Sequence, residues 1–313
     1  MERDDVDIVE KDQTMSIQYV VPRDTQDKPR EGLDRIDQTK FPLDGKYAFP
    51  NSAGQGVNIF IVDTGILTTH QEFEGRAKLG GVFCDGCKSA DDENGHGTNC
   101  ASIAAGKTFG VAKKATLIAV RVLGADGKGN NSDVINGLSF VLDQHNNATN
   151  KNSVVSMSLG GPQSNAVNKA VQDLTNAGVH VVVAAGNEGV DACLSSPSSE
   201  PSAITVGATE LTNDNITDFS NFGKCVDIFA PGRNVTGAGI RSDNAISIFS
   251  GTSQATPHVA GTLALIIAQS GKNQSPAQMA KTLDNLSTKN IVNFGDPNVK
   301  NTTKNSFLRV PAQ

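Results

Sequence analysis

The stretch Gly251-Thr252-Ser253-Gln254-Ala255-Thr256-Pro257-His258-Val259-Ala260 is the most informative segment of this 313-residue chain. It places a serine among small residues at the start of a predicted helix, which runs from Ser253 to about Ser270. A serine hydroxyl is a weak nucleophile near neutral pH unless a base accepts its proton and a third group orients that base. The stretch therefore directs attention to histidines and acids elsewhere in the chain.

Two upstream segments supply such partners. Ile59-Phe60-Ile61-Val62-Asp63-Thr64-Gly65 ends an apolar strand in an aspartate, and Asn94-Gly95-His96-Gly97-Thr98 places a histidine at a glycine-flanked turn into a helix. Ser253 is the candidate nucleophile, His96 the candidate general base and then acid, and Asp63 the group that orients His96. The unpaired N–H groups at the start of the helix after Ser253 would favour developing negative charge.

The order Asp, His, Ser along the chain is that of subtilisin. Four further segments occur in the same order as in that family: Ser156–Gly161, Val183–Asn187, Phe219–Gly223 and Asp227–Gly232. The chain resembles the subtilases, and within them the proteinase K branch, from about Asp5 to its C-terminus. This resemblance implies a serine endopeptidase that forms an acyl-enzyme and prefers apolar or aromatic residues before the scissile bond.

Strand-like and helix-like segments alternate after about residue 51. Apolar strand patterns cover 57–62, 115–122, 154–158, 179–184 and 204–208, and helical patterns cover 96–105, 133–144, 165–177, 253–270 and a segment after Ser275-Pro276. This alternation predicts an α/β fold, and the resemblance specifies a three-layer subtilisin-like fold with a mostly parallel central sheet and helices on both faces. Residues 1–20 resemble the end of an inhibitory propeptide, and 22–51 have weak patterning typical of an arm. We expect 21–313 to form a single peptidase domain.

The resemblance assigns roles to residues around the predicted triad. Asn187 is the expected oxyanion donor, because Gly186-Asn187 ends a buried strand where a side-chain amide would face the substrate. A peptide bound as an added strand takes its hydrogen bonds from exposed strand edges. The expected substrate-binding residues are Gly129, Asn130, Ser158, Leu159 and Gly160, with Ala184, Ala185 and Gly186 leaving a roomy apolar pocket.

Two alternatives use the same sequence features. A peptide ligase or cyclase on the same fold would have the same catalytic residues, whereas an inactive subtilase-like binding protein would require the loss of one of them. Gln254 stands where the family usually has methionine, next to the nucleophile. Cys100 lies four residues after His96 on a predicted helix, so the two side chains share a face; we expect a free thiol there, as in proteinase K-like proteins.

The other four cysteines predict disulfides. Cys193 and Cys225 fall where some secreted relatives carry a bridge, and the resemblance implies the same pair here. Cys84 and Cys87 lack a thioredoxin-like setting and the two further ligands of a zinc site, which leaves a small loop-closing disulfide as the preferred interpretation.

Calcium is the ion that the resemblance implies. The carbonyl oxygens of Pro201 and Ala203 and the carboxylate of Asp227 resemble one structural site of proteinase K, and such hard oxygen ligands suit Ca²⁺. Of the remaining histidines, His258 is expected to be a hydrogen-bonded structural residue. His70, His145 and His180 have surface-like contexts.

Charge and hydropathy exclude several classes of partner. The net charge is −6, and lysines and arginines are scattered, which argues against nucleic acid and anionic membranes. No apolar run reaches the roughly 18 residues of a membrane span. The acidic start is no signal peptide; we expect a signal sequence upstream of it, and hence a secreted monomer that acts on proteins and peptides and is inhibited by its own propeptide.

Overall fold

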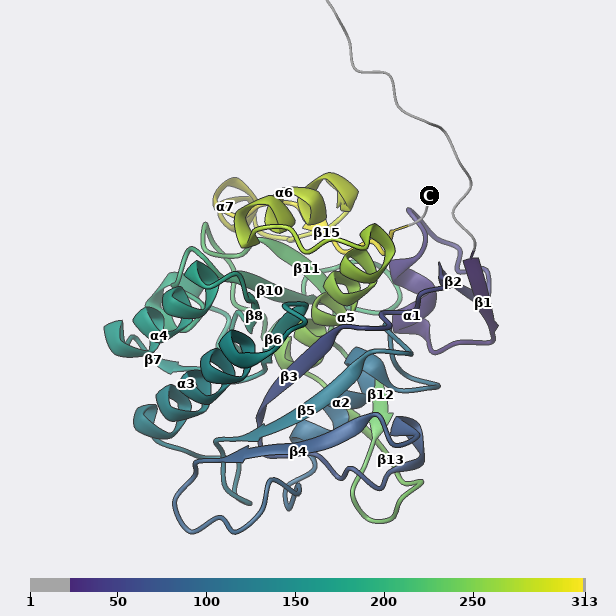
Figure 1. Cartoon of the computed structure of the whole chain (residues 1–313). Coiled ribbons are helices and arrows are strands. Elements are labelled where there is room, and N and C mark those ends of the chain that lie inside the picture. The colour runs from purple at the N-terminus through teal and green to yellow at the C-terminus, as the bar shows by residue number, and fades with distance from the viewer. Residues whose placement is uncertain (1–22, 312–313) are drawn as a thin grey trace, which may run out of the picture.

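A nine-stranded sheet forms the centre of the computed structural model, which describes residues 23–311 (Figure 1). Its strand order is β14-β15-β11-β10-β8-β6-β3-β5-β4, and every pairing is parallel except that of β14 with β15. The strands are β3 (Asn58–Asp63), β4 (Ala77–Val82), β5 (Thr116–Arg121), β6 (Ser153–Met157), β8 (His180–Ala184), β10 (Ile204–Thr209), β11 (Ile228–Pro231), β14 (Thr288–Lys289) and β15 (Ser306–Phe307). The predicted propeptide remnant, 1–20, lies outside the described residues.

Helices cover both faces of this sheet, as expected from the alternating pattern. On β3, Ile59 and Ile61 pack into one core together with α2 (His96–Ala105) and α5 (Thr252–Ser270). Phe60 and Val62 point the other way and pack with α3 (Asn131–Asn147) and α4 (Asn165–Asn176). Because successive side chains of a strand face opposite sides, one continuous apolar run serves both cores. The three-layer α/β prediction is confirmed.

Helix α5 crosses the larger core and is buried along most of its length. It ends where Gly271 adopts a left-handed conformation, φ 64°, which a glycine allows without strain. Gly261 lets it approach α2 closely, because a Cβ at this position would lie 2.6 Å from the Ala104 carbonyl oxygen. The helix that begins at Ser253 in the sequence pattern is therefore the central helix of the fold.

The N-terminal arm has more regular structure than its weak patterning suggested. Strands β1 (Arg23–Asp27) and β2 (Lys46–Pro50) pair antiparallel, and α1 (Glu31–Ile36) lies between them in the chain. Leu33 and Tyr47 anchor the arm in the main core. The remaining short elements are η1 (Gln71–Phe73), β7 (Gly161–Pro162), η2 (Ala192–Leu194), β9 (Ser195–Ser196), β12 (Val235–Ala238), β13 (Ile246–Phe249), α6 (Pro276–Leu286) and α7 (Pro297–Thr302).

Between residues 23 and 311, no helix is both long and apolar enough to cross a membrane. Disulfides join Cys84 to Cys87 and Cys193 to Cys225, which are the two expected pairs.

The surface position expected for three histidines is wrong. His70, His145 and His180 are each at most 3% exposed. Most of their ring nitrogens have hydrogen-bond partners, and several of these partners are distant in sequence. For example, His145 Nδ1 lies 2.9 Å from Ser153 Oγ, and its Nε2 lies 3.1 Å from the Ala177 carbonyl oxygen.

Candidate active site

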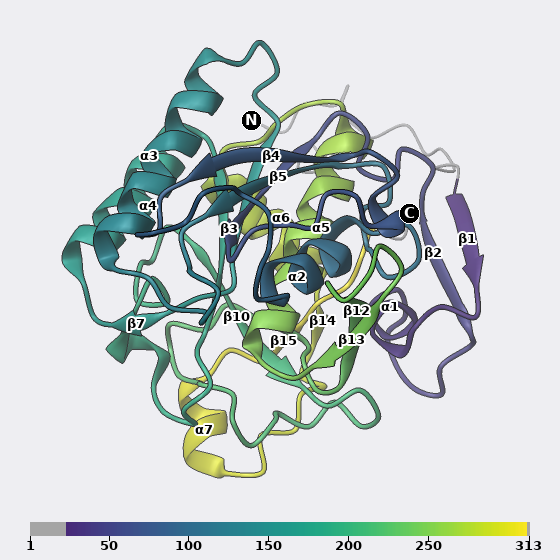
Figure 2. The same cartoon turned by 90° about the horizontal axis from the view of Figure 1, so that it is seen from below.

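The predicted triad gathers at the carboxyl edge of the sheet. Asp63 is the last residue of β3, His96 the first of α2 and Ser253 the second of α5. Helices α2 and α5 pack side by side on one face of the sheet, so their N-termini bring histidine and serine to the strand that carries the aspartate (Figure 2). Sites in parallel sheets collect at this edge because the strand ends converge there.

Asp63 and His96 form a hydrogen-bonded pair. His96 Nδ1 lies 2.8 Å from Asp63 Oδ1, and the same oxygen accepts the Thr64 backbone N–H at 2.7 Å. The Asp63 side chain is fully buried, whereas that of His96 is 27% exposed. Burial by itself lowers the pKa of His96, but the charge of Asp63 and its hydrogen bond outweigh this, so the pKa of His96 lies well above its usual range. The pair is therefore arranged to stabilise an imidazolium.

The Ser253 hydroxyl points toward β6. Its Oγ donates to the Ser158 carbonyl oxygen at 3.2 Å, and among the described residues no hydrogen bond joins it to His96. Catalytic hydrogen bonds often form fully only with substrate bound, so this arrangement is compatible with transfer of the serine proton to His96.

Cys100 is free and buried, as expected. Its Sγ lies 4.0 Å from His96 Nδ1 and donates to the Ser253 carbonyl oxygen at 3.4 Å. The expectation for His258 is also confirmed, since its Nδ1 lies 2.8 Å from the Gln254 carbonyl oxygen and burial lowers its pKa to about 4. Neither side chain competes with His96 for the role of base.

Asn187 stands beside the nucleophile in a fixed orientation. Its Oδ1 accepts the Thr252 backbone N–H at 2.8 Å and the Thr252 hydroxyl at 3.0 Å, which leaves Nδ2 available as a donor. Gly186, with φ 104°, turns the chain out of β8; a Cβ here would lie 2.3 Å from Asn221 Nδ2.

Asn221 is a supporting residue whose individual role the sequence did not reveal. It is fully buried, its Nδ2 donates to the Ala185 carbonyl oxygen at 2.9 Å, and its Oδ1 accepts the backbone N–H groups of Glu188 and Val190. These bonds hold the turn that carries Asn187. Its only signal in the sequence is its place in the family-like segment Phe219–Gly223.

Two hollows flank the triad and share Ser158, Leu159 and Gly160. One, of about 500 Å³, is lined also by Ala184, Ala185, Gly186, Asn187, Glu188 and Ser253. The other, of about 480 Å³, is lined also by His96, Leu123 and Gly129. Asn130 lines neither hollow; it forms a capping box with Asp133 at the start of α3, where its backbone N–H donates to the Asp133 carboxylate at 2.9 Å.

The predicted calcium ligands lie around the start of β10. Asp227 Oδ2 accepts the Thr205 backbone N–H at 2.9 Å, and Pro201 and Ala203 belong to the turn that precedes this strand. Burial raises the pKa of Asp227 above its ordinary value. A partly buried carboxylate held beside a turn is chemically suited to a hard cation.

Comparison with known proteins places the chain in a family. Residues 54–305 match the subtilase family, and this protein belongs to it. It is 49% identical over 261 residues to the extracellular serine proteinase of a Thermus species, and the matched region covers 83% of this chain and 62% of that protein. It is 44% identical over 289 residues to the cuticle-degrading protease of Metarhizium anisopliae, covering 92% of this chain and 72% of that protein.

A solved structure agrees with this assignment. The crystal structure of a cold-adapted subtilisin-like serine proteinase matches with a TM-score of 0.84 and 41% identity, and the match covers 91% of this chain and all of the other. The resemblance stated from the sequence is thus confirmed. The chain spans less than two thirds of the length of the Thermus relative. Members of the subtilase family generally bind structural calcium.

Proposed function

We propose that this protein is a serine endopeptidase that cleaves peptide bonds through an acyl-enzyme. The observation that carries the proposal is the 2.8 Å contact between Asp63 and His96 beside a hollow lined by Ser253 and Asn187. The family assignment supports it, and neither ligase nor binding-protein alternatives are favoured.

The reaction follows from the positions of these groups. Ser253 Oγ attacks the scissile carbonyl carbon while His96 accepts the hydroxyl proton, and Asp63 stabilises the resulting imidazolium. Asn187 Nδ2 and the Ser253 N–H, which has no intrahelical acceptor in the first turn of α5, donate to the oxyanion. His96 then protonates the leaving amine, the acyl-enzyme forms, and water attacks it by the same route in reverse.

The substrate is proposed to lie extended across the two hollows. Ser158 and Gly160 on one side and Gly129 on the other offer backbone groups for strand-like pairing. The small side chains of Ala184 and Ala185 leave room for an apolar or aromatic residue before the scissile bond. Asn130 would take part from the start of α3, where it forms a capping box with Asp133.

The wider assignment rests on the relatives. We propose that the protein is secreted, because it is similar to the extracellular serine proteinase of Thermus. We propose further that it functions as a monomer and is inhibited by its own propeptide. Residues 21–313 would form the peptidase domain, and one structural Ca²⁺ would be held by Pro201, Ala203 and Asp227. The ion would pair with the Asp227 carboxylate and fix the turn before β10.

The decisive test compares wild type with Ser253→Ala on a peptide anilide and on a protein substrate. Ser270→Ala, at the far end of the same helix, is the matched control. Wild type and Ser270→Ala should hydrolyse both substrates and be labelled at one residue by a fluorophosphonate, and Ser253→Ala should do neither. Hydrolysis retained by Ser253→Ala would refute the assignment. If the wild-type acyl-enzyme reacted in water mainly with amines and not with water itself, a ligase would be favoured.

A further inference from the structure

Asp92 receives an unusual number of hydrogen bonds for a carboxylate in an acidic surface loop. It is 6% exposed. Its Oδ1 accepts from Thr64 Oγ1 at 2.9 Å, Asn94 N at 2.9 Å and Gly95 N at 2.8 Å, and its Oδ2 accepts from Thr98 N at 2.9 Å and Thr98 Oγ1 at 2.6 Å. All five groups donate to it, so an ionised carboxylate satisfies the site, whereas a protonated one would set a donor against a donor.

A chain of hydrogen bonds connects Asp92 with both Asp63 and the turn that carries His96. The Thr64 hydroxyl donates to Asp92 and accepts the Gly97 backbone N–H at 2.9 Å, while the Thr64 backbone N–H donates to Asp63 Oδ1. The same Asp63 oxygen faces His96 Nδ1. Asp92 thus connects the end of β3 with the turn on both sides of His96.

Asp92 also completes the start of α2. The N-cap residue, Gly95, has no side chain to accept a hydrogen bond from the first turn. Asp92 accepts the Thr98 N–H instead, which satisfies an otherwise free donor and places negative charge at the helix N-terminus.

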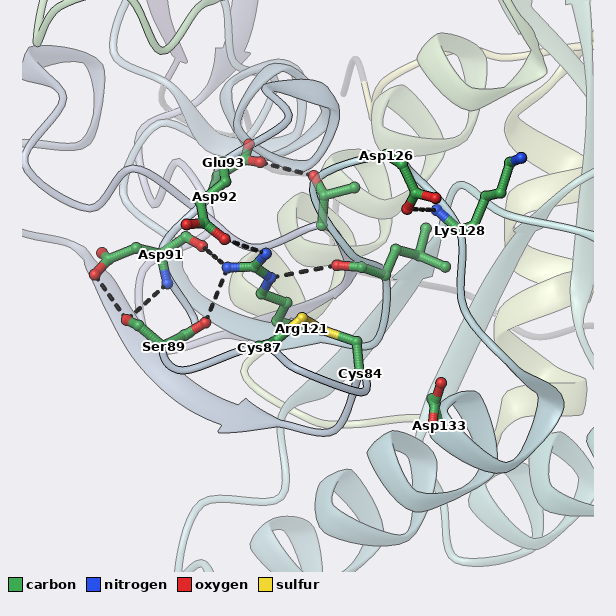
Figure 3. Close-up of a disulfide and its surroundings, with 12 residues drawn as sticks. Cys84, Cys87, Ser89, Asp91, Asp92, Glu93, Arg121, Asp126, Lys128 and Asp133 are labelled. Atoms are coloured by element: carbon green, nitrogen blue, oxygen red, sulfur yellow. Dashed lines mark hydrogen bonds and ion pairs between the residues drawn. A yellow bond between two sulfur atoms is a disulfide. The ribbon is translucent and has the colours of Figure 1, made fainter.

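Arg121 fixes the loop on both sides of Asp92 (Figure 3). Its Nη1 donates to the Asp91 carbonyl oxygen at 2.7 Å and its Nη2 to Glu93 Oε2 at 2.6 Å, and the arginine is 1% exposed. Arg121 ends β5 in direct register with Asp63, the end of β3. Two adjacent strand ends therefore hold the aspartate of the triad and the loop that carries Asp92.

We propose that Asp92 is a positioning residue that sets the separation and alignment of Asp63 and His96, an inference that rests on the proposed peptidase function. Without its carboxylate, Thr64 and the turn around His96 lose their shared acceptor. The two catalytic side chains are then held by independent segments. A misplacement of about 1 Å in a reacting group can cost about 10²-fold in rate.

A change in pH dependence distinguishes this role from general support of the fold. The titratable groups that face His96 are Asp63 on β3 and Cys100 on α2, while Phe249 of β13 presents an apolar ring. If Asp63 moves away, the imidazolium loses stabilisation and the pKa of His96 falls. The acid limb of activity then moves to lower pH, in addition to the loss of rate.

The test compares Asp92→Asn with Asp91→Asn, each normalised to active sites by fluorophosphonate titration. Asp91 is the matched control, because its carboxylate is exposed and, within residues 23–311, hydrogen-bonds only to Ser89 in the same loop. Asp92→Asn should lower kcat about 10²-fold with little change in KM and shift the acid limb to lower pH. Asp91→Asn should change none of these.

If Asp92→Asn fails to fold, Thr64→Val and Thr64→Ser decide the question, since only valine removes the hydroxyl that donates to Asp92 and accepts the Gly97 N–H, while the Thr64 backbone N–H still donates to Asp63. Thr64→Val should lose more kcat than Thr64→Ser, and only Thr64→Val should shift the acid limb of the pH–activity profile to lower pH. An acid limb equal to that of wild type, or a loss confined to KM, would overturn the role of Asp92. A wild-type protein without hydrolysis would instead refute the proposed function.

Discussion

The two disulfides should stabilise the protein by different amounts, because they close loops of different length. Cys193–Cys225 spans 32 residues and Cys84–Cys87 spans 3. Loop-closure entropy in the unfolded chain then gives about 3.7 kcal/mol for the first bridge and about 1.6 kcal/mol for the second at 25 °C. With an unfolding entropy of about 2.1 cal/mol/K per residue, these values correspond to about 6 °C and about 2 °C in Tm for a 313-residue chain.

The measurement replaces each pair by alanine in a Ser253→Ala background, which prevents self-digestion during heating. Calorimetric Tm values of the two double variants and their parent give the two shifts. The long-loop pair should lose two to three times as much as the short-loop pair. Equal shifts, or a larger shift for Cys84 and Cys87, would show that folded-state contacts of the bridges outweigh loop entropy and would refute this reasoning.

Three further outcomes follow from the site and the core. Asp63→Asn should lower kcat about 10⁴-fold and move the acid limb of the rate profile to lower pH, since Asp63 raises the pKa of His96; an unmoved limb in kcat measured against pH would contradict this. Burial, with repulsion from neighbouring acids, raises the pKa of Asp37 to about 7, so the folded state holds this proton more tightly than the unfolded chain does. Stability should therefore fall as pH rises from about 4, the ordinary aspartate pKa, to about 7 and level off above that. Asp37→Asn should flatten this part of a plot of Tm against pH, and an unchanged slope would show that Asp37 does not cause the pH dependence. Gln254 is buried and has no sulfur, so wild type should keep more activity in peroxide than Gln254→Met; equal rates of inactivation would show that position 254 does not control oxidation.

Local pattern predicted those parts of the fold whose cause is local. The predicted helix 96–105 has the bounds of α2, because a glycine-flanked start and a following run of small buried residues specify it. The predicted helix 253–270 likewise agrees with α5, which has small residues at its start and is followed by Gly271. The five predicted strands also match the buried centre of the sheet, since apolar runs of that length suit strands covered on both faces.

The features that the sequence did not predict depend on contacts between distant segments. His145 and His180 are polar residues in a core, and only the folded chain supplies the groups beside their rings, such as Asn273 Oδ1 at 2.6 Å from His180 Nε2. Asp92 sits in the run Asp91-Asp92-Glu93, which is typical of a solvated loop. Neither its burial nor its contact with Thr64 has a local signature.

The nucleophile and the base of the site lie on two segments that are buried to different extents. Ser253 lies in the first turn of α5, which is buried along most of its length, whereas His96 follows a surface loop that Arg121 holds and that a short disulfide precedes. Native proteins open in units of unequal stability, and surface loops generally exchange their amide hydrogens before core helices do. Exchange at Gly95 and Gly97 should therefore be faster than along the middle of α5. Heat would then separate base from nucleophile by a sub-global opening, and activity would be lost below the temperature at which the sheet melts.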